Sequence, residues 1–146
     1  MGFKNDLVRG VKAEQKLLER ILKVYPSAVL VNAFKGYDIW IPEKHFGIEV
    51  KYDPMSNKTN NIVVEFEMNG KPSALMTTTA DYWVFFDDVS FKWFKPKEIV
   101  RCIFDNKLTH VEFTGNGDTK SKKAFLIKKD MLYKYGKDTL SAYNCS

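Results

Sequence analysis

Apolar residues recur at spacings of three and four positions from about Asn5 to Tyr25. Such spacing is typical of one face of an amphipathic helix. Asn5 or Asp6 would cap this helix, and Pro26 would end it. The recurring apolar positions are Leu7, Val8, Val11, Leu17, Leu18, Ile21 and Leu22. A long helix is therefore predicted over this stretch.

Short β-rich runs follow the helix, each bounded by turn residues. The first covers residues 28–34. Two more, 37–41 and 48–52, are joined by the turn-forming residues 42–45. This arrangement predicts a β-hairpin.

Helical, β-rich and polar segments alternate along the rest of the chain. Strands are predicted at 62–68, 82–86, 91–94 and 124–127. Helices are predicted at 96–106, where a proline occupies the first turn, and around 130–135. Loops are predicted at 54–61 and 114–123. The fold class is therefore α/β (α+β), with a mixed β-sheet flanked by helices.

The composition indicates one folded domain covering residues 1–146. Hydrophobic residues make up 45% of the chain, and the net charge of +5 favours a polyanionic partner such as nucleic acid. Cys102 and Cys145 are too far apart in sequence for a disulfide framework or a zinc motif. No apolar run approaches the roughly 20 residues that cross a bilayer. We therefore expect a cytoplasmic protein.

The predicted hairpin carries three charged residues, Asp38, Glu49 and Lys51. If its loop is symmetric, Asp38 lies directly opposite Glu49, with Cβ atoms about 4.5–5.5 Å apart. Glu49 and Lys51 share one face of their strand, because successive side chains alternate. Two carboxylates beside an ammonium group favour a divalent-metal phosphodiesterase site. The alternative is an ordinary Glu–Lys ion pair on an exposed strand, with Asp38 merely ending a turn.

Glu14 occupies a position of the first helix where the periodicity calls for an apolar residue. Burying an unpaired carboxylate is costly unless a metal, a cation or hydrogen bonds offset the loss of hydration. Glu14 is therefore a candidate fourth member of the site. The alternative places it at the helix edge, paired with a nearby lysine.

The run from Asp38 to Lys51 resembles the signature of the PD-(D/E)xK nuclease superfamily, in which Glu-x-Lys follows an Asp after a spacer. Residues 70–84, Gly-Lys-Pro-Ser-Ala-Leu-Met-Thr-Thr-Thr-Ala-Asp-Tyr-Trp-Val, extend the resemblance to small phage and bacterial members. Ala74 stands where those proteins usually have a glycine. The resemblance implies a restriction-endonuclease-like fold with a catalytic β-hairpin.

The same resemblance implies a Mg²⁺ cofactor, for which Mn²⁺ can substitute. The metal ligands that it implies are Asp38, Glu49, the backbone carbonyl of Val50 and Glu14. Lys51 would orient or help deprotonate the attacking water and stabilise charge in the transition state.

From these residues we expect a Mg²⁺-dependent DNA endonuclease. Structure-specific cleavage, as by a Holliday-junction resolvase, is the favoured subclass, and a symmetric junction would call for a homodimer. One alternative is a nicking or single-strand nuclease in phage or plasmid DNA processing. Another is a catalytically silent nucleic-acid-binding module of the same fold.

Other residues are assigned supporting roles. Glu65 and Glu67 are expected on one face of their strand, with Glu65 a candidate neighbour of the metal ligands. The lysines expected to contact DNA phosphates, with plain solvent exposure as the alternative, are Lys58, Lys120, Lys122 and Lys123. The aromatic residues of 82–86 are expected in the core rather than stacked on bases. His45 and His110 are expected in turns or at the surface.

Overall fold

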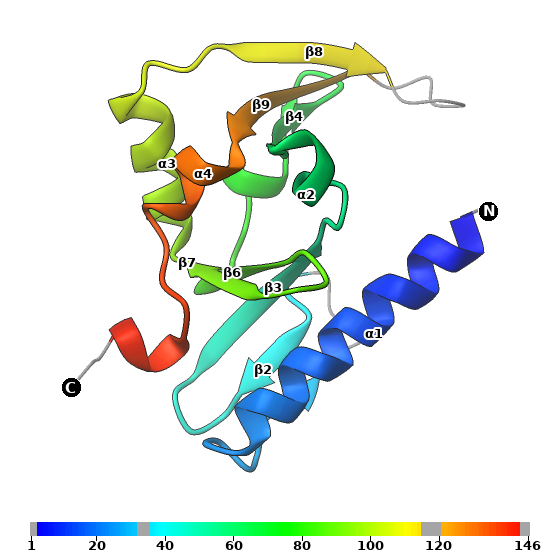
Figure 1. Ribbon diagram of the computed structural model, residues 1–146, viewed down its shortest axis with the longest axis vertical. Coiled ribbons are helices and arrows are strands. Elements are labelled where there is room, and N and C mark those ends of the chain that lie inside the picture. Colours follow the sequence, from blue (N-terminus) through cyan, green and yellow to red (C-terminus); the bar gives the residue numbers. More distant parts are fainter. Residues whose placement is uncertain (1–2, 32–35, 115–120, 144–146) are drawn as a thin grey trace.

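The computed structural model describes residues 3–31, 36–114 and 121–143. Within them the chain is a mixed α+β protein with two β-sheets (Figure 1). The helices are α1 (Phe3–Leu22), α2 (Ser56–Thr59), α3 (Pro96–Asp105) and α4 (Lys129–Tyr133), with 3₁₀ turns η1 (Ala74–Met76) and η2 (Leu140–Tyr143). The strands are β1 (Val29–Leu30), β2 (Ile39–Ile41), β3 (Phe46–Tyr52), β4 (Asn61–Met68), β5 (Lys71–Pro72), β6 (Tyr82–Phe86), β7 (Phe91–Phe94), β8 (His110–Thr114) and β9 (Ser121–Lys128). The mixed class agrees with the prediction, whereas the strands divide between two sheets instead of forming one.

The first sheet has the strand order β1-β2-β3-β6-β7. β2 and β3 form the antiparallel hairpin predicted from the sequence, and β3 then pairs with β6 in parallel. Every residue of β6 is buried, as expected for a strand that is covered on both faces. Helix α1 crosses one of these faces diagonally in Figure 1.

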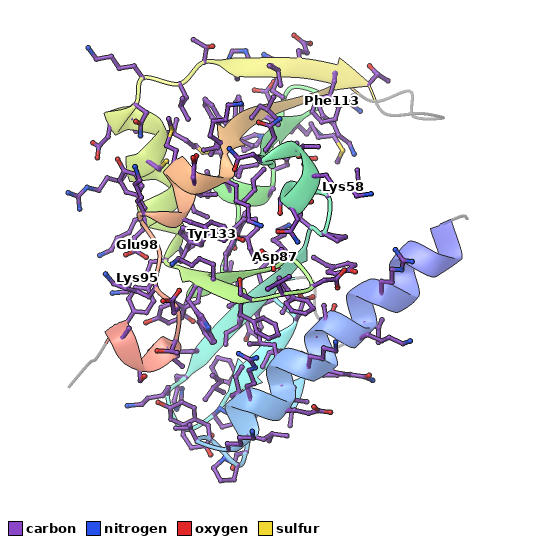
Figure 2. All side chains as sticks on the ribbon, viewed as in Figure 1. Lys58, Asp87, Lys95, Glu98, Phe113 and Tyr133 are labelled. Carbon is purple, nitrogen blue, oxygen red and sulfur yellow. The ribbon has the colours of Figure 1, made fainter. Side chains whose placement is uncertain are left out.

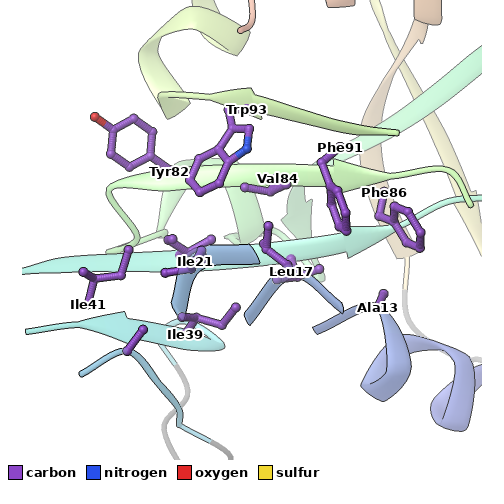
Figure 3. Packing of buried hydrophobic residues seen from close by; sticks show 13 residues of the cluster. Ala13, Leu17, Ile21, Ile39, Ile41, Tyr82, Val84, Phe86, Phe91 and Trp93 are labelled. Atoms are coloured by element: carbon purple, nitrogen blue, oxygen red, sulfur yellow. The ribbon is translucent and has the colours of Figure 1, made fainter. Parts of the chain in front are cut away.

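Helix α1 packs on this sheet through one apolar stripe, which meets the inward side chains of the strands (Figure 3). The buried residues of the stripe are Ala13, Leu17 and Ile21. The strands contribute Ile39, Ile41, Ile48, Val50, Tyr82, Val84 and Phe86. Because alternate side chains of a strand point to opposite faces, Glu49 and Lys51 of β3 face away from α1.

The second sheet is antiparallel, with the order β5-β4-β9-β8. A separate buried cluster joins this sheet to α3, α4 and the first sheet. Trp83 and Phe85 of β6 belong to this cluster, and they pair in register with Glu49 and Lys51 of β3. The face that bears the charged hairpin residues therefore looks toward the second sheet.

Several short elements of the fold escaped prediction, among them β5, η1 and η2. Helix α2 lies inside the predicted polar loop at 54–61, and β8 lies in a segment without a predicted strand. All residues of β8 are exposed, so no buried face produces the alternating pattern that predicts a strand. The first predicted strand is observed as the two residues of β1, and residues 32–35 lie outside the described residues.

The backbone at Ala74 has a positive φ of 42°. This left-handed region is disfavoured for residues with a Cβ atom and easily adopted by glycine. The position where the resemblance expects a glycine thus has a conformation that glycine adopts with less strain than alanine.

Two further expectations concern cysteine and membrane segments. Cys102 lies in helix α3, as predicted, and is buried there, and Cys145 lies outside the described residues. In the described part of the chain, no helix combines the length and apolar character needed to span a membrane.

Candidate active site

The β2–β3 hairpin holds Asp38 beside Glu49. Ile39 pairs with Ile48 in the hairpin register, so the next position outward sets Asp38 opposite Glu49, as the sequence predicts. The amide of Asp38 donates to the carbonyl of Ile48 at 2.8 Å. Its side-chain Oδ2 accepts a hydrogen bond from the Val50 amide, also at 2.8 Å. Both the backbone and the side chain of Asp38 are therefore fixed against β3.

Burial raises the pKa of both hairpin carboxyls above their ordinary values. For Asp38, burial outweighs the hydrogen bond from Val50 and the charge of Lys51, which both lower the pKa. For Glu49, burial outweighs the lowering effect of Lys51, and the negative charge of Asp38 raises the pKa further. Two partly buried carboxyl groups therefore lie beside one ammonium group, that of Lys51.

Glu14 joins the same electrostatic cluster from α1. Burial, followed by the charges of Asp38 and Glu49, raises the pKa of Glu14 to about 7. The prediction that Glu14 lies on the buried apolar stripe is wrong, because Val11 is exposed and the buried stripe consists of Ala13, Leu17 and Ile21. Glu14 lies partly buried at the edge of that stripe, close enough to the hairpin for its charge to act there.

Lys51 completes the cluster with a single positive charge. Its Nζ lies 3.5 Å from Glu49 Oε2 and 4.8 Å from the centre of a Trp83 ring. The Trp83 indole N–H donates to Thr78 Oγ1 at 3.0 Å, which fixes the ring. A carboxylate and an aromatic face thus hold the ammonium group, while the side chain remains 37% exposed and accessible to a substrate.

The residues present fit Mg²⁺ in their chemistry. Mg²⁺ prefers oxygen ligands and is usually held by one or two carboxylates, with water completing its coordination. Asp38 and Glu49 supply two such groups and also repel each other. Among the described residues, no group of three or more His, Cys, Asp or Glu side chains has the arrangement of a metal site. The coupling of Glu14 to the pair is electrostatic, and direct ligation by Glu14 or by the Val50 carbonyl remains a prediction.

The lysines predicted to contact DNA lie in different structural elements. Lys58 is exposed on α2 (Figure 2), and Lys120 lies outside the described residues. The prediction that Lys122 and Lys123 lie in a loop is wrong, because both belong to β9. Pairing with β4 and β8 orders the backbone of this segment.

A bulge in β4 separates Glu65 from Glu67. In the register with β9, Glu65 pairs with Ala124 and Glu67 pairs with the adjacent Lys123. The two glutamates therefore face opposite sides of the sheet, and the prediction that they share a face is wrong. Glu65 borders the same groove as Lys51, which keeps it a candidate neighbour of the site.

The aromatic run in β6 and both histidines are placed as predicted. The aromatic side chains, at most 5% exposed, are Tyr82, Trp83, Phe85 and Phe86. His45 lies in the hairpin turn with a positive φ of 55°, and His110 is exposed in β8.

A basic groove along α1 was not predicted. Arg9, Lys12 and Lys16 lie three and four residues apart, which places them on one face of the helix. Together with Tyr52 and Asp88 they border a groove of about 330 Å³. Three cations and one carboxylate at a groove suit a polyanionic ligand. The helical periodicity that locates the apolar stripe would also have located these basic residues.

The assignment of a function rests on the residues and geometry above. A comparison of the chain with known protein families, with functionally characterised proteins and with solved structures yields no match.

Proposed function

We propose that this protein is a Mg²⁺-dependent DNA endonuclease of the PD-(D/E)xK type that hydrolyses phosphodiester bonds in structured DNA, as a Holliday-junction resolvase does. The proposal rests on a cluster of charged residues at the end of the hairpin away from its turn. The carboxyl groups of Asp38, Glu49 and Glu14 lie there with one ammonium group, that of Lys51. Asp38 and Glu49 oppose each other with raised pKa values, and Lys51 is the cation paired with Glu49. Accumulated carboxylate charge of this kind is favourable where a divalent cation binds.

Each residue of the cluster has a defined role in this proposal. Asp38 and Glu49 would hold Mg²⁺, which when bound supplies charge neutralisation and a more acidic water. Lys51 lies on the same strand face as Glu49, so its ammonium group can orient the attacking water and donate a hydrogen bond to a phosphoryl oxygen. Glu14, with a pKa of about 7, can hold or release a proton beside the site near neutral pH.

The basic groove of α1 supports nucleic acid as the substrate. Its three cations belong to the helix that also carries Glu14, so a phosphate backbone bound there would lie close to the hairpin. Phosphate contacts position a nucleic acid without reading its sequence. This suits an enzyme that recognises DNA shape.

The test offers four-way, nicked, linear and single-stranded DNA to the protein, with Mg²⁺ or with a chelator. Asp38→Asn keeps an oxygen that can accept the Val50 hydrogen bond but removes the charge. Lys51→Ala removes the ammonium group. Both variants should bind DNA and lose cleavage by about 100- to 1,000-fold, because the groups act mainly on the transition state. Glu43→Gln and Lys44→Ala, in the exposed turn of the same hairpin, are the matched controls.

The substrate series separates the alternatives. Preferential cutting of four-way DNA supports the resolvase-like subclass, and equal cutting of single strands supports the nicking or single-strand alternative. If Asp38→Asn and Lys51→Ala cut like the parent, the site is wrong. Binding without cleavage in both Mg²⁺ and Mn²⁺ would show a silent binding module and overturn the proposal.

A further inference from the structure

A second groove, of about 270 Å³, opens beside Lys51 on the face of the first sheet that looks toward the second. Buried Trp83 lines it from β6, whereas Val63 and Phe113 are 53% and 39% exposed. Phe113 belongs to β8, at the top of the molecule in Figure 2. Large apolar side chains that are exposed at a groove often mark a place where a ligand packs.

The polar groups of this groove complement a nucleotide. Lys51 comes from β3 and Lys122 from β9. Lys122 Nζ lies 4.0 Å from Glu65 Oε1, and the Ser73 hydroxyl donates to Glu65 Oε2 at 2.7 Å. Ammonium groups can bind the phosphates of a strand while an aromatic ring stacks on its base. A carboxylate can accept a hydrogen bond from an exocyclic amino group of the base.

We propose that this groove binds an unpaired nucleobase of the DNA strand beside the scissile phosphate, with Phe113 as its stacking partner. The inference rests on the proposed function, because that function places the scissile phosphate at Lys51. A base inside a duplex is stacked on its neighbours and cannot offer its face to Phe113. The substrate class is therefore DNA whose nucleotides are unpaired at the cut, as in single strands or where base pairs open at the branch point of a junction, and not intact duplex.

Charge distinguishes this groove from an interface between two copies of the chain. The cores of protein–protein interfaces are depleted in lysine and glutamate, whereas Lys51, Lys122 and Glu65 all border this groove. A nucleotide needs this combination of cations and an apolar face, so the nucleotide is the occupant that the groove fits.

The test measures DNA binding in chelator, where Mg²⁺-dependent cleavage is stopped. Phe113→Ala should weaken binding of a short single strand about 10-fold, since base–aromatic stacking is commonly worth a factor of this order. Binding of the matched duplex should change less than twofold. Phe113→Trp keeps an aromatic face and should restore single-strand binding. Phe104→Ala is the matched control, because Phe104 is a 75% exposed phenylalanine on α3 that does not border the groove.

A second measurement uses a strand that contains 2-aminopurine, whose fluorescence falls when the base stacks. The parent and Phe113→Trp should quench it, and Phe113→Ala should not. Equal losses for single strand and duplex, no loss at all, or a parent dimer that Phe113→Ala dissociates in sedimentation would each overturn the inference.

Failure of the inference and failure of the nuclease proposal give different results. If no DNA is cut in Mg²⁺ or Mn²⁺ but single-strand binding depends on Phe113, the groove assignment stands as a binding site and the nuclease function falls. If cleavage depends on Asp38 and Lys51 while Phe113→Ala binds single strands like the parent, the groove assignment falls and the nuclease function stands.

Discussion

Two carboxylate–lysine pairs of this protein differ in how completely the carboxylate is satisfied. Asp87, at the end of β6, lies 2.6 Å from Lys129 Nζ and accepts hydrogen bonds from the amides of Val89 and Ser90. Burial would raise its pKa, but these hydrogen bonds and the charge of Lys129 hold it below its ordinary value. In the hairpin cluster the balance is reversed, and the pKa values of Asp38 and Glu49 are raised.

The surroundings explain the difference. The side chains of Asp87 and Lys129 are 6% and 14% exposed, and Lys129 Nζ also donates to Asn57 Oδ1 at 2.6 Å. This network joins the first sheet, α2 and the start of α4, close to the ring of Tyr133 (Figure 2). The charges of Asp87 and Lys129 therefore compensate each other, and hydrogen bonds from neighbouring residues complete the network. The hairpin cluster has three coupled carboxylates and one lysine, so it retains the capacity to bind a further cation.

The largest expected effect comes from breaking the satisfied pair. Asp87→Asn leaves the charge of Lys129 poorly compensated and should lower the free energy of unfolding by about 3 kcal/mol, measured by urea denaturation at pH 7. Adding Lys129→Met should recover much of that loss. The loss should shrink as the pH falls below the ordinary pKa of 3.8 and through the lowered folded pKa, because the parent is then protonated. Asp88→Asn, its exposed neighbour, is the control, and an equal loss there would contradict the comparison.

The second prediction concerns the hairpin cluster and its capacity to bind Mg²⁺. Mg²⁺ should raise the Tm of the parent, since a ligand at ten times its Kd stabilises the folded state by about 1.4 kcal/mol. Asp38→Asn should lose this increase without being destabilised in chelator, because the substitution relieves repulsion with Glu49. Glu43→Gln should respond to Mg²⁺ like the parent. Equal Mg²⁺ responses of all three proteins would remove Asp38 from the metal site.

The third prediction follows from the raised pKa of Glu14. In chelator, the parent should lose stability as the pH rises from the ordinary value of 4.5 to about 7, because folding then disfavours the charged carboxylate. Glu14→Gln lacks this titration, so its Tm should exceed that of the parent by a few degrees at pH 8 and by less at pH 5. Glu19→Gln, exposed on the same helix, should not show this change. A Tm difference independent of pH would mean that burial and the hairpin charges do not raise the pKa of Glu14.

The smallest effect is expected for a partly exposed ion pair. Lys123 Nζ lies 3.2 Å from Glu67 Oε2, with side chains 34% and 27% exposed. A double-mutant cycle with Lys123→Ala and Glu67→Ala should give a coupling below about 1 kcal/mol. The corresponding cycle for Asp87 and Lys129 should give a larger one. Equal couplings would mean that burial does not determine the strength of these pairs.

Local sequence patterns predicted much of the fold. The spacing of Leu17 and Ile21 indicated the buried stripe of α1, and the proline at position 96 marked the start of α3. The turn at residues 42–45 predicted the hairpin register that sets Asp38 opposite Glu49. These features depend on interactions between residues near one another in the chain, so a single sequence carries enough information for them.

The sequence by itself therefore determined the hairpin and the identity of its charged residues. Only the tertiary structure decided which of them share one electrostatic environment, because Glu14 reaches the hairpin by the packing of α1 on the sheet. The same holds for the groove beside Lys51, where Phe113 of β8 and Lys122 of β9 meet a strand about 60 to 70 positions earlier in the chain. Contacts of this kind depend on the packing of segments far apart in the chain, and such packing produces no periodic pattern of apolar residues in the local sequence.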